Sequence, residues 1–187
     1  MIGKLEETNN LRVVWDTEAK FTSWLAEDKN IKILSEASGL NIAVEEVSSS
    51  EILASDMDTG KRIEIGNQLE ETEHDYLGQL ITNAAGKDAK IIIWLAGNSR
   101  REHKNAIEWL NANMNDNVKI YLFRIRLYYV RDSEPAVYAV RFEPVVKPDI
   151  KSPNSNNASK IEELRFDYWN KFQDYAFNDA RDKGFSS

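Results

Sequence analysis

Hydrophobic and polar positions repeat along the chain with the two periods that distinguish strands from helices. Strict alternation, which places successive side chains on opposite faces of a strand, predicts strands over 41–47, 50–55 and 61–69. A nearly unbroken apolar run over 89–97 predicts a central strand that is covered on both faces. Two long β-rich segments, expected to be strands, follow at 118–130 and 137–146.

Helical spacing of the apolar positions predicts three helices, one before these strands and two between them. The first covers 22–37, with a break near Asp28, and Gly39 is expected to end it in the left-handed conformation. The second starts after Thr72, a predicted N-cap with Asp75 as its acidic partner, and ends near Gly86. The third covers 101–114.

The segment between residues 50 and 69 has the chemistry of a β-hairpin. The letters DMDTG supply a turn, and a four-residue loop over 57–60 would place Glu51 opposite Gly66. Directly opposed residues share a sheet face. We therefore expect Glu51, Glu64, Gly66 and Gln68 on one outward face, and Ile63, Ile65 and Leu69 on the opposite, core-facing side.

The element order predicts an α/β fold, a mixed sheet flanked by helices. Residues 1–148 are expected to form this domain, and residues 149–160, rich in Pro, Ser and Asn, a linker. An amphipathic helix with an aromatic stripe is predicted over 161–187. Its residues 161–177 offer a surface for a protein partner or for self-association.

Composition narrows the chemistry that the chain can perform. The chain has no cysteine and two histidines, His74 and His103, which excludes disulfides, cysteine nucleophiles and multi-histidine metal sites. It contains no apolar run long enough to span a bilayer and no signal-peptide pattern at its start, so we expect a cytoplasmic protein without a membrane segment.

Charge is distributed unevenly along the sequence, although the formal net charge is only −7. Residues 1–86 carry 7 basic and 17 acidic side chains, whereas residues 87–151 carry 12 basic and 8 acidic ones. Within the basic part, Arg100, Arg101 and Lys104 stand at a predicted helix start, where cations do not complement the helix dipole. They are candidate contacts to nucleic-acid phosphates, and a solvated surface remains the alternative.

Two carboxylates on one sheet face form a hard oxygen site of the kind that Mg²⁺ prefers. Such a site can lower the pKa of a bound water and stabilise charge on a reacting phosphate. Glu51 and Glu64 are the candidate metal ligands here. The alternatives are that Glu51 is an exposed edge carboxylate and that Glu64 pairs with Arg62 or another cation.

The segment from Ser50 to Ala96 resembles an uncharacterised prokaryotic family of nuclease-like proteins in the PD-(D/E)XK superfamily. That family has an acidic residue in its second strand, a Glu-Asn-Gln-Leu motif in its third, and a Thr-(Asp/Glu)-His-Asp-(His/Tyr)-Leu-Gly-Gln-Leu segment. The matching positions here are 67–69, 72–80 and 84–86, and the similarity extends from Leu11 to about Pro148. The helix after the linker resembles the opening of a further domain, so the chain is expected to be truncated there.

The resemblance implies a restriction-endonuclease-like fold and metal-dependent hydrolysis of DNA. Glu51 would hold Mg²⁺, and Gln68 would orient the water or the phosphate. The motif glutamate, however, falls on Gly66, which supplies no ligand, so Glu64 would have to replace it. We therefore expect nuclease activity to be weak or lost, and the alternative is a non-enzymatic module that binds nucleic acid or protein.

Two interpretations stay open at the level of sequence. Gly66 marks either a lost carboxylate or a bulge or close backbone approach. His74, Asp75, Gln79 and Asn83 form a polar stripe at helical spacing, which either borders the candidate site or faces water.

Overall fold

The structure is a computed structural model that describes residues 4–114, 118–131 and 135–148. All of them belong to one compact unit, Met1–Pro148. The predicted linker over 149–160, the helix over 161–187 and the partner-binding segment 161–177 lie outside the described residues. The domain limits therefore stay predictions.

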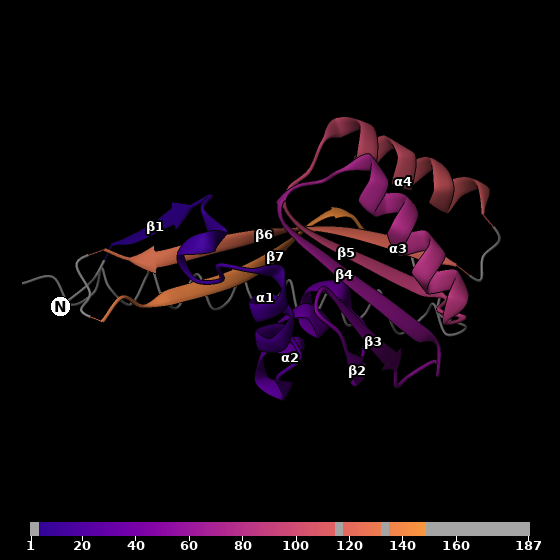
Figure 1. The fold of residues 1–187 in the computed structure, drawn as a ribbon, viewed down its shortest axis with the longest axis horizontal. Coiled ribbons are helices and arrows are strands. Elements are labelled where there is room, and N and C mark those ends of the chain that lie inside the picture. Colours follow the sequence, from indigo (N-terminus) through magenta and orange to yellow (C-terminus); the bar gives the residue numbers. More distant parts are fainter. Residues whose placement is uncertain (1–3, 115–117, 132–134, 149–187) are drawn as a thin grey trace, which may run out of the picture. The chain divides into compact units, whose positions relative to one another are not determined.

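The described chain forms an α/β structure with one mixed β-sheet (Figure 1). Its elements are, in chain order, β1 (Leu5–Thr8), the 3₁₀ turn η1 (Leu11–Val13), α1 (Glu18–Leu25), α2 (Asp28–Ser38), β2 (Ile42–Val47), β3 (Glu51–Asp56), β4 (Arg62–Glu71), α3 (His74–Gly86), β5 (Ile91–Asn98), α4 (Arg101–Asn113), β6 (Lys119–Val130) and β7 (Tyr138–Val146). Among the described residues, no helix has the length and apolar character that crossing a membrane requires.

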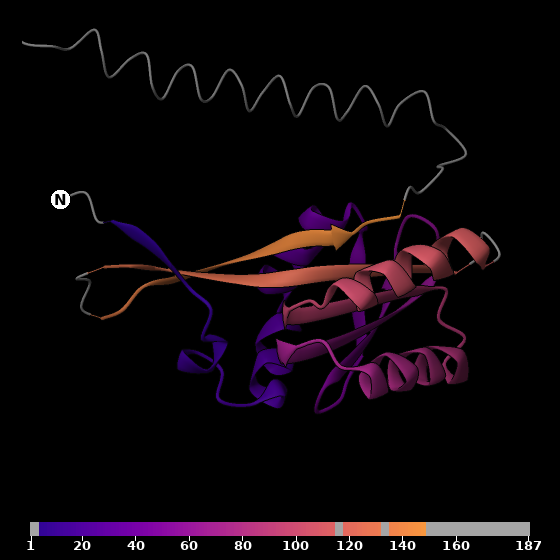
Figure 2. The same cartoon turned by 90° about the horizontal axis from the view of Figure 1, so that it is seen from above.

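The sheet has the strand order β1-β6-β5-β4-β3-β2, and β7 pairs with β6. Its centre is parallel, from β4 through β5 to β6, because α3 and α4 connect these strands as crossovers. The remaining pairs are antiparallel. The long β6–β7 ribbon extends beyond the N-terminal ends of α3 and α4 (Figure 2).

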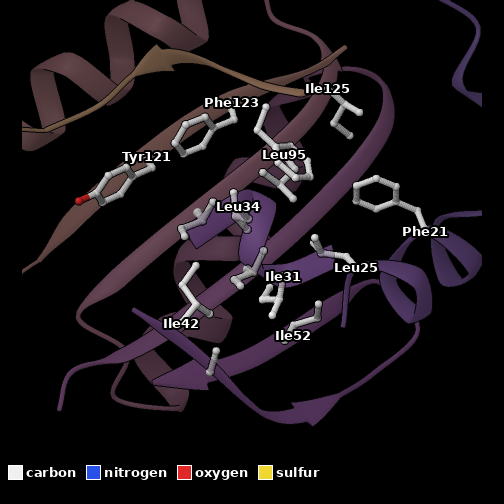
Figure 3. Packing of buried hydrophobic residues seen from close by; sticks show 14 of the residues in the cluster. Phe21, Leu25, Ile31, Leu34, Ile42, Ile52, Leu95, Tyr121, Phe123 and Ile125 are labelled. Carbon is white, nitrogen blue, oxygen red and sulfur yellow. The ribbon is translucent and has the colours of Figure 1, made fainter. Parts of the chain in front are cut away.

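Helices cover both faces of the sheet. Side chains of α1 and α2 pack on one face together with Ile63 and Ile65 of β4, and they form the larger core (Figure 3). Side chains of α3 and α4 pack on the other face. This arrangement explains the apolar run of β5, because Ile93 faces the first core and Trp94 the second.

Most predicted elements are confirmed, with shifted limits. The hairpin has the predicted register, in which Glu51 pairs with Gly66, and the amide of Asp56 donates to the carbonyl of Lys61 at 2.9 Å. The first helix is broken as expected, into α1 and α2, and Gly39 ends it at φ +77°. Neither β1 nor η1 was expected, because segments this short carry little periodicity of their own.

The predicted helix cap at Thr72 is wrong. The N-cap of α3 is Glu73, whose side chain makes no capping hydrogen bond. Thr72 is instead fully buried, and its Oγ1 accepts a hydrogen bond from the amide of Arg100 at 3.0 Å. The capping pattern cannot distinguish the two roles, because it does not show that β4 continues to Glu71 and carries Thr72 into the interior.

Candidate functional site

The β3–β4 hairpin brings the two candidate carboxylates together beneath α3. Glu51 opens β3 opposite Gly66, and Glu64 precedes Gly66 by two residues on the same face of β4. Both carboxylates contact the ammonium of Lys87, Glu64 at 2.8 Å and Glu51 at 3.5 Å. Glu51 and Glu64 therefore share a sheet face as predicted, but this face points at a helix and not outward, and their role as metal ligands stays a prediction.

Lys87 is the cation of this cluster, and the sequence prediction missed it. It is the C-cap residue of α3 and lies one helical turn after Asn83, whose side-chain amide donates to Oε1 of Glu51. Burial lowers the pKa of Lys87, but Glu64 and then Glu51 outweigh burial and raise it, so the side chain is a full positive charge. The sequence does contain a signal for Lys87, because it follows Asn83 by four residues and residues at this spacing lie on the same face of a helix.

Glu64 is an unusual carboxylate because none of its surface is exposed. Its Oε1 accepts from Lys87, while its Oε2 is buried without a hydrogen-bond partner. Burial raises the pKa of Glu64, Lys87 lowers it, and the negative charge of Glu51 raises it again; the net shift is upward. Pairing with Arg62 is excluded, because that guanidinium donates to the backbone carbonyl of Lys87.

Gly66 lies under the side chains of α3. A Cβ atom at this position would lie 2.6 Å from Oη of Tyr76 and 2.7 Å from Cδ1 of Leu80. Gly66 pairs with Glu51 of β3, and its pairing with β5 continues on both sides without a register shift, so the position is a close approach and not a bulge. The space into which a motif glutamate would project is thus filled by Tyr76, whose buried hydroxyl has no hydrogen-bond partner.

Gln68 lies two residues beyond Gly66 on the same face, and protein groups engage its carboxamide. Its Oε1 accepts from Nε1 of Trp94 at 3.2 Å and from the amide of Glu73 at 3.4 Å. The side chain therefore ties β4 to β5 and to the start of α3. Its bonded partners are groups of the fold, not the carboxylate pair.

The three basic candidates gather at the start of α4, but two of them have acidic neighbours. Arg100 pairs with Glu71 at 2.8 Å, and Lys104 lies 3.7 Å from Glu108. Arg101 is exposed. Since Glu71 follows Glu64 by seven residues in β4, this cluster lies about 20 Å along the strand from the carboxylate pair.

The predicted polar stripe of α3 divides between two environments. Asn83 borders the carboxylate cluster, and His74 contacts His103 of α4 at 2.6 Å. Asp75 and Gln79 are exposed. The stripe therefore touches the candidate site at one end of the helix only.

The arrangement limits what the carboxylates can bind. No group of three or more His, Cys, Asp or Glu side chains within the described ranges is placed to hold a metal ion. Lys87 already neutralises part of the charge of Glu51 and Glu64. A divalent ion bound by both carboxylates would have to displace this ammonium, and its third protein ligand would have to come from elsewhere.

Comparison of the chain with protein-family models, with curated proteins and with solved structures gives no match.

Proposed function

We propose that the protein is a nuclease-like protein of PD-(D/E)XK lineage in which metal-dependent DNA hydrolysis is weak or lost. The observation that carries this proposal is the occupied site. Lys87 takes the cation position between Glu51 and Glu64, and Tyr76 takes the space above Gly66. A tethered ammonium cannot activate a water as a divalent ion does.

Residual activity would follow a defined route in this chain. Mg²⁺ would supply an activated water, Glu51 and Glu64 would hold the ion, and Gln68 would orient the water or the phosphate. Lys87, with one third of its side chain exposed, would first have to leave the carboxylates. Gln68 would have to give up its hydrogen bond to Trp94. Each requirement lowers the population of a competent site.

A cleavage assay tests the proposal. Wild-type protein and the Glu64→Gln variant are incubated with single- and double-stranded DNA in the presence of Mg²⁺ or Mn²⁺. We expect both proteins to give the same background. Cleavage by the wild type that Glu64→Gln abolishes would show an active enzyme with a migrated carboxylate and would refute the proposal.

A non-enzymatic module that binds nucleic acid is the second candidate, and the exposed Arg101 favours it. In this case Arg100, Arg101 and Lys104 contact phosphates and the nuclease-like core serves as a scaffold. Binding of a labelled DNA should weaken as salt rises, and Arg101→Ala should reduce the slope of that dependence by about one. The control is Lys29→Ala. It removes an exposed cation of α2 that pairs with Glu27. Equal slopes for the two variants would exclude this surface.

A further inference from the structure

The two histidines of the chain meet at the point where β4, α3 and α4 come together. His103 of α4 is 2% exposed, and its Nδ1 lies 2.6 Å from Oγ1 of the buried Thr72. Its Nε2 lies 2.6 Å from Nδ1 of His74, at the first position of α3. His74 itself is exposed, so the chain of contacts leads from the interior to solvent.

The hydroxyl of Thr72 can donate to one partner while it accepts from another, and this favours one direction for these hydrogen bonds. Oγ1 of Thr72 accepts from the amide of Arg100 at 3.0 Å, so its own hydrogen is available to Nδ1 of His103. Neutral His103 then carries its proton on Nε2 and donates it to His74. Trp94 packs beside His103, with 5.5 Å between the ring centroids.

We propose that His74 and His103 form a proton-operated latch that ties the starts of α3 and α4 to the end of β4. One added proton is compatible with the contact, because an imidazolium still donates to a neutral imidazole. Two added protons place an N–H on each of the facing nitrogens at 2.6 Å, which breaks the bond and sets two positive charges side by side. The second proton therefore opens the latch.

Four carboxylates and one guanidinium are the charged groups next to the pair. Glu71 at the end of β4 and Glu102 of α4 favour a protonated His103, while Arg100 opposes it. Glu73 and Asp75 flank His74 in sequence. Burial, and then the charge of His74, lowers the pKa of His103, so its neutral form is favoured in the folded protein. The latch does not depend on the carboxylate cluster or on the proposed function.

Side-chain NMR of the full-length protein tests the latch, because two histidines give two assignable imidazoles. Between about pH 7.5 and about pH 5 we expect the curve of His103 to lie at low pH, because burial and the neighbouring His74 lower its pKa. In His74→Gln, His103 should accept its proton at a higher pH than in the wild type, since the positive neighbour is gone. Gln79→Ala, an exposed change on the same helix, should leave its curve unchanged. A His103 curve that His74→Gln leaves unaltered would overturn the proposal.

Thermal unfolding gives a second readout that does not depend on the NMR assignment. Across the same acidification the melting temperature of the wild type should fall more than that of His74→Gln. The variant keeps the effect of burial on the pKa of His103 but loses the effect of His74. An identical loss in both proteins would show that the contact is structural only.

Discussion

At the candidate site the ammonium of Lys87 and the hydroxyl of Tyr76 occupy the places where a nuclease would need a metal ion and a carboxylate. Glu51 and Glu64 remain, but both contact Lys87. The cluster carries one more negative than positive charge when both carboxylates are ionised. Glu64 has an unpaired Oε2, and burial raises its pKa.

Gly66→Ala tests the close packing above the site. The new methyl group meets Oη of Tyr76 and Cδ1 of Leu80 below 3 Å, so we expect the free energy of unfolding to fall by about 1–3 kcal/mol. Gly78→Ala is the matched control, because nothing lies within 4 Å of its Cβ position on α3. That variant should gain about 0.5–1 kcal/mol. Chemical denaturation measures both, and similar effects of the two changes would contradict the observed packing.

Lys87→Met tests the ion pair at the residue scale. It leaves the fully buried Glu64 without its cation, and breaking a buried pair typically costs about 3–5 kcal/mol. Because Lys87 is one-third exposed, we expect a smaller cost than for a fully buried pair, about 2–3 kcal/mol. Lys90→Met removes an exposed pair with Asp88 and should change stability by less than about 0.5 kcal/mol. Equal losses would show that Lys87 is a surface cation.

The raised pKa of Glu64 determines how its contribution to the free energy of unfolding changes with pH. The folded state holds the proton more tightly than the unfolded state, so this stabilisation is complete below the unfolded value, near 4.5, and is lost as pH rises through the folded pKa. Glu64→Gln cannot ionise. Its stability relative to the wild type should therefore increase with pH across this window, as urea unfolding at several pH values would show. Glu36→Gln, an exposed change, should run parallel to the wild type.

At the scale of elements, the β3–β4 hairpin could be predicted from sequence and the cover above it could not. Alternation fixes which residues of β4 share a face, and the turn fixes the register, so Glu51 opposite Gly66 followed from local rules. Lys87 and Tyr76 reach the site through the packing angle of α3. That angle depends on the contact of Tyr76 with Trp94 of β5 and on the burial of Leu80 in the same core, which local periodicity does not encode.

Gly97 tests the packing of β5 against the end of β4. A Cβ atom there would overlap the backbone carbonyl of Leu69, next to the register shift between Gln68 and Glu71. Backbone cannot rotate away as a side chain can, so Gly97→Ala should cost about 2 kcal/mol or more. Gly86→Ala, with open space around its Cβ position, is the control. A tolerated Gly97→Ala in calorimetric unfolding would refute this arrangement of the two strands.

At the scale of the whole molecule, the mixed sheet and its two helical layers leave the carboxylate cluster enclosed between β3, β4 and α3. The basic residues at the start of α4 lie along β4 from it and pair in part with acids. Catalysis on a phosphodiester needs metal, carboxylates and phosphate contacts in one place. The described structure places the candidate phosphate contacts apart from the carboxylates, in line with the proposal that nuclease activity is weak or lost.

Titration of the wild-type protein with Mn²⁺ by calorimetry tests the central claim most directly. With Lys87 between Glu51 and Glu64, we predict no saturable binding at millimolar metal, and the same baseline for Glu51→Gln and Glu64→Gln. Saturable binding of one ion by the wild type that both substitutions abolish would show that the carboxylates form a working metal site, and would contradict the claim that Lys87 has replaced it.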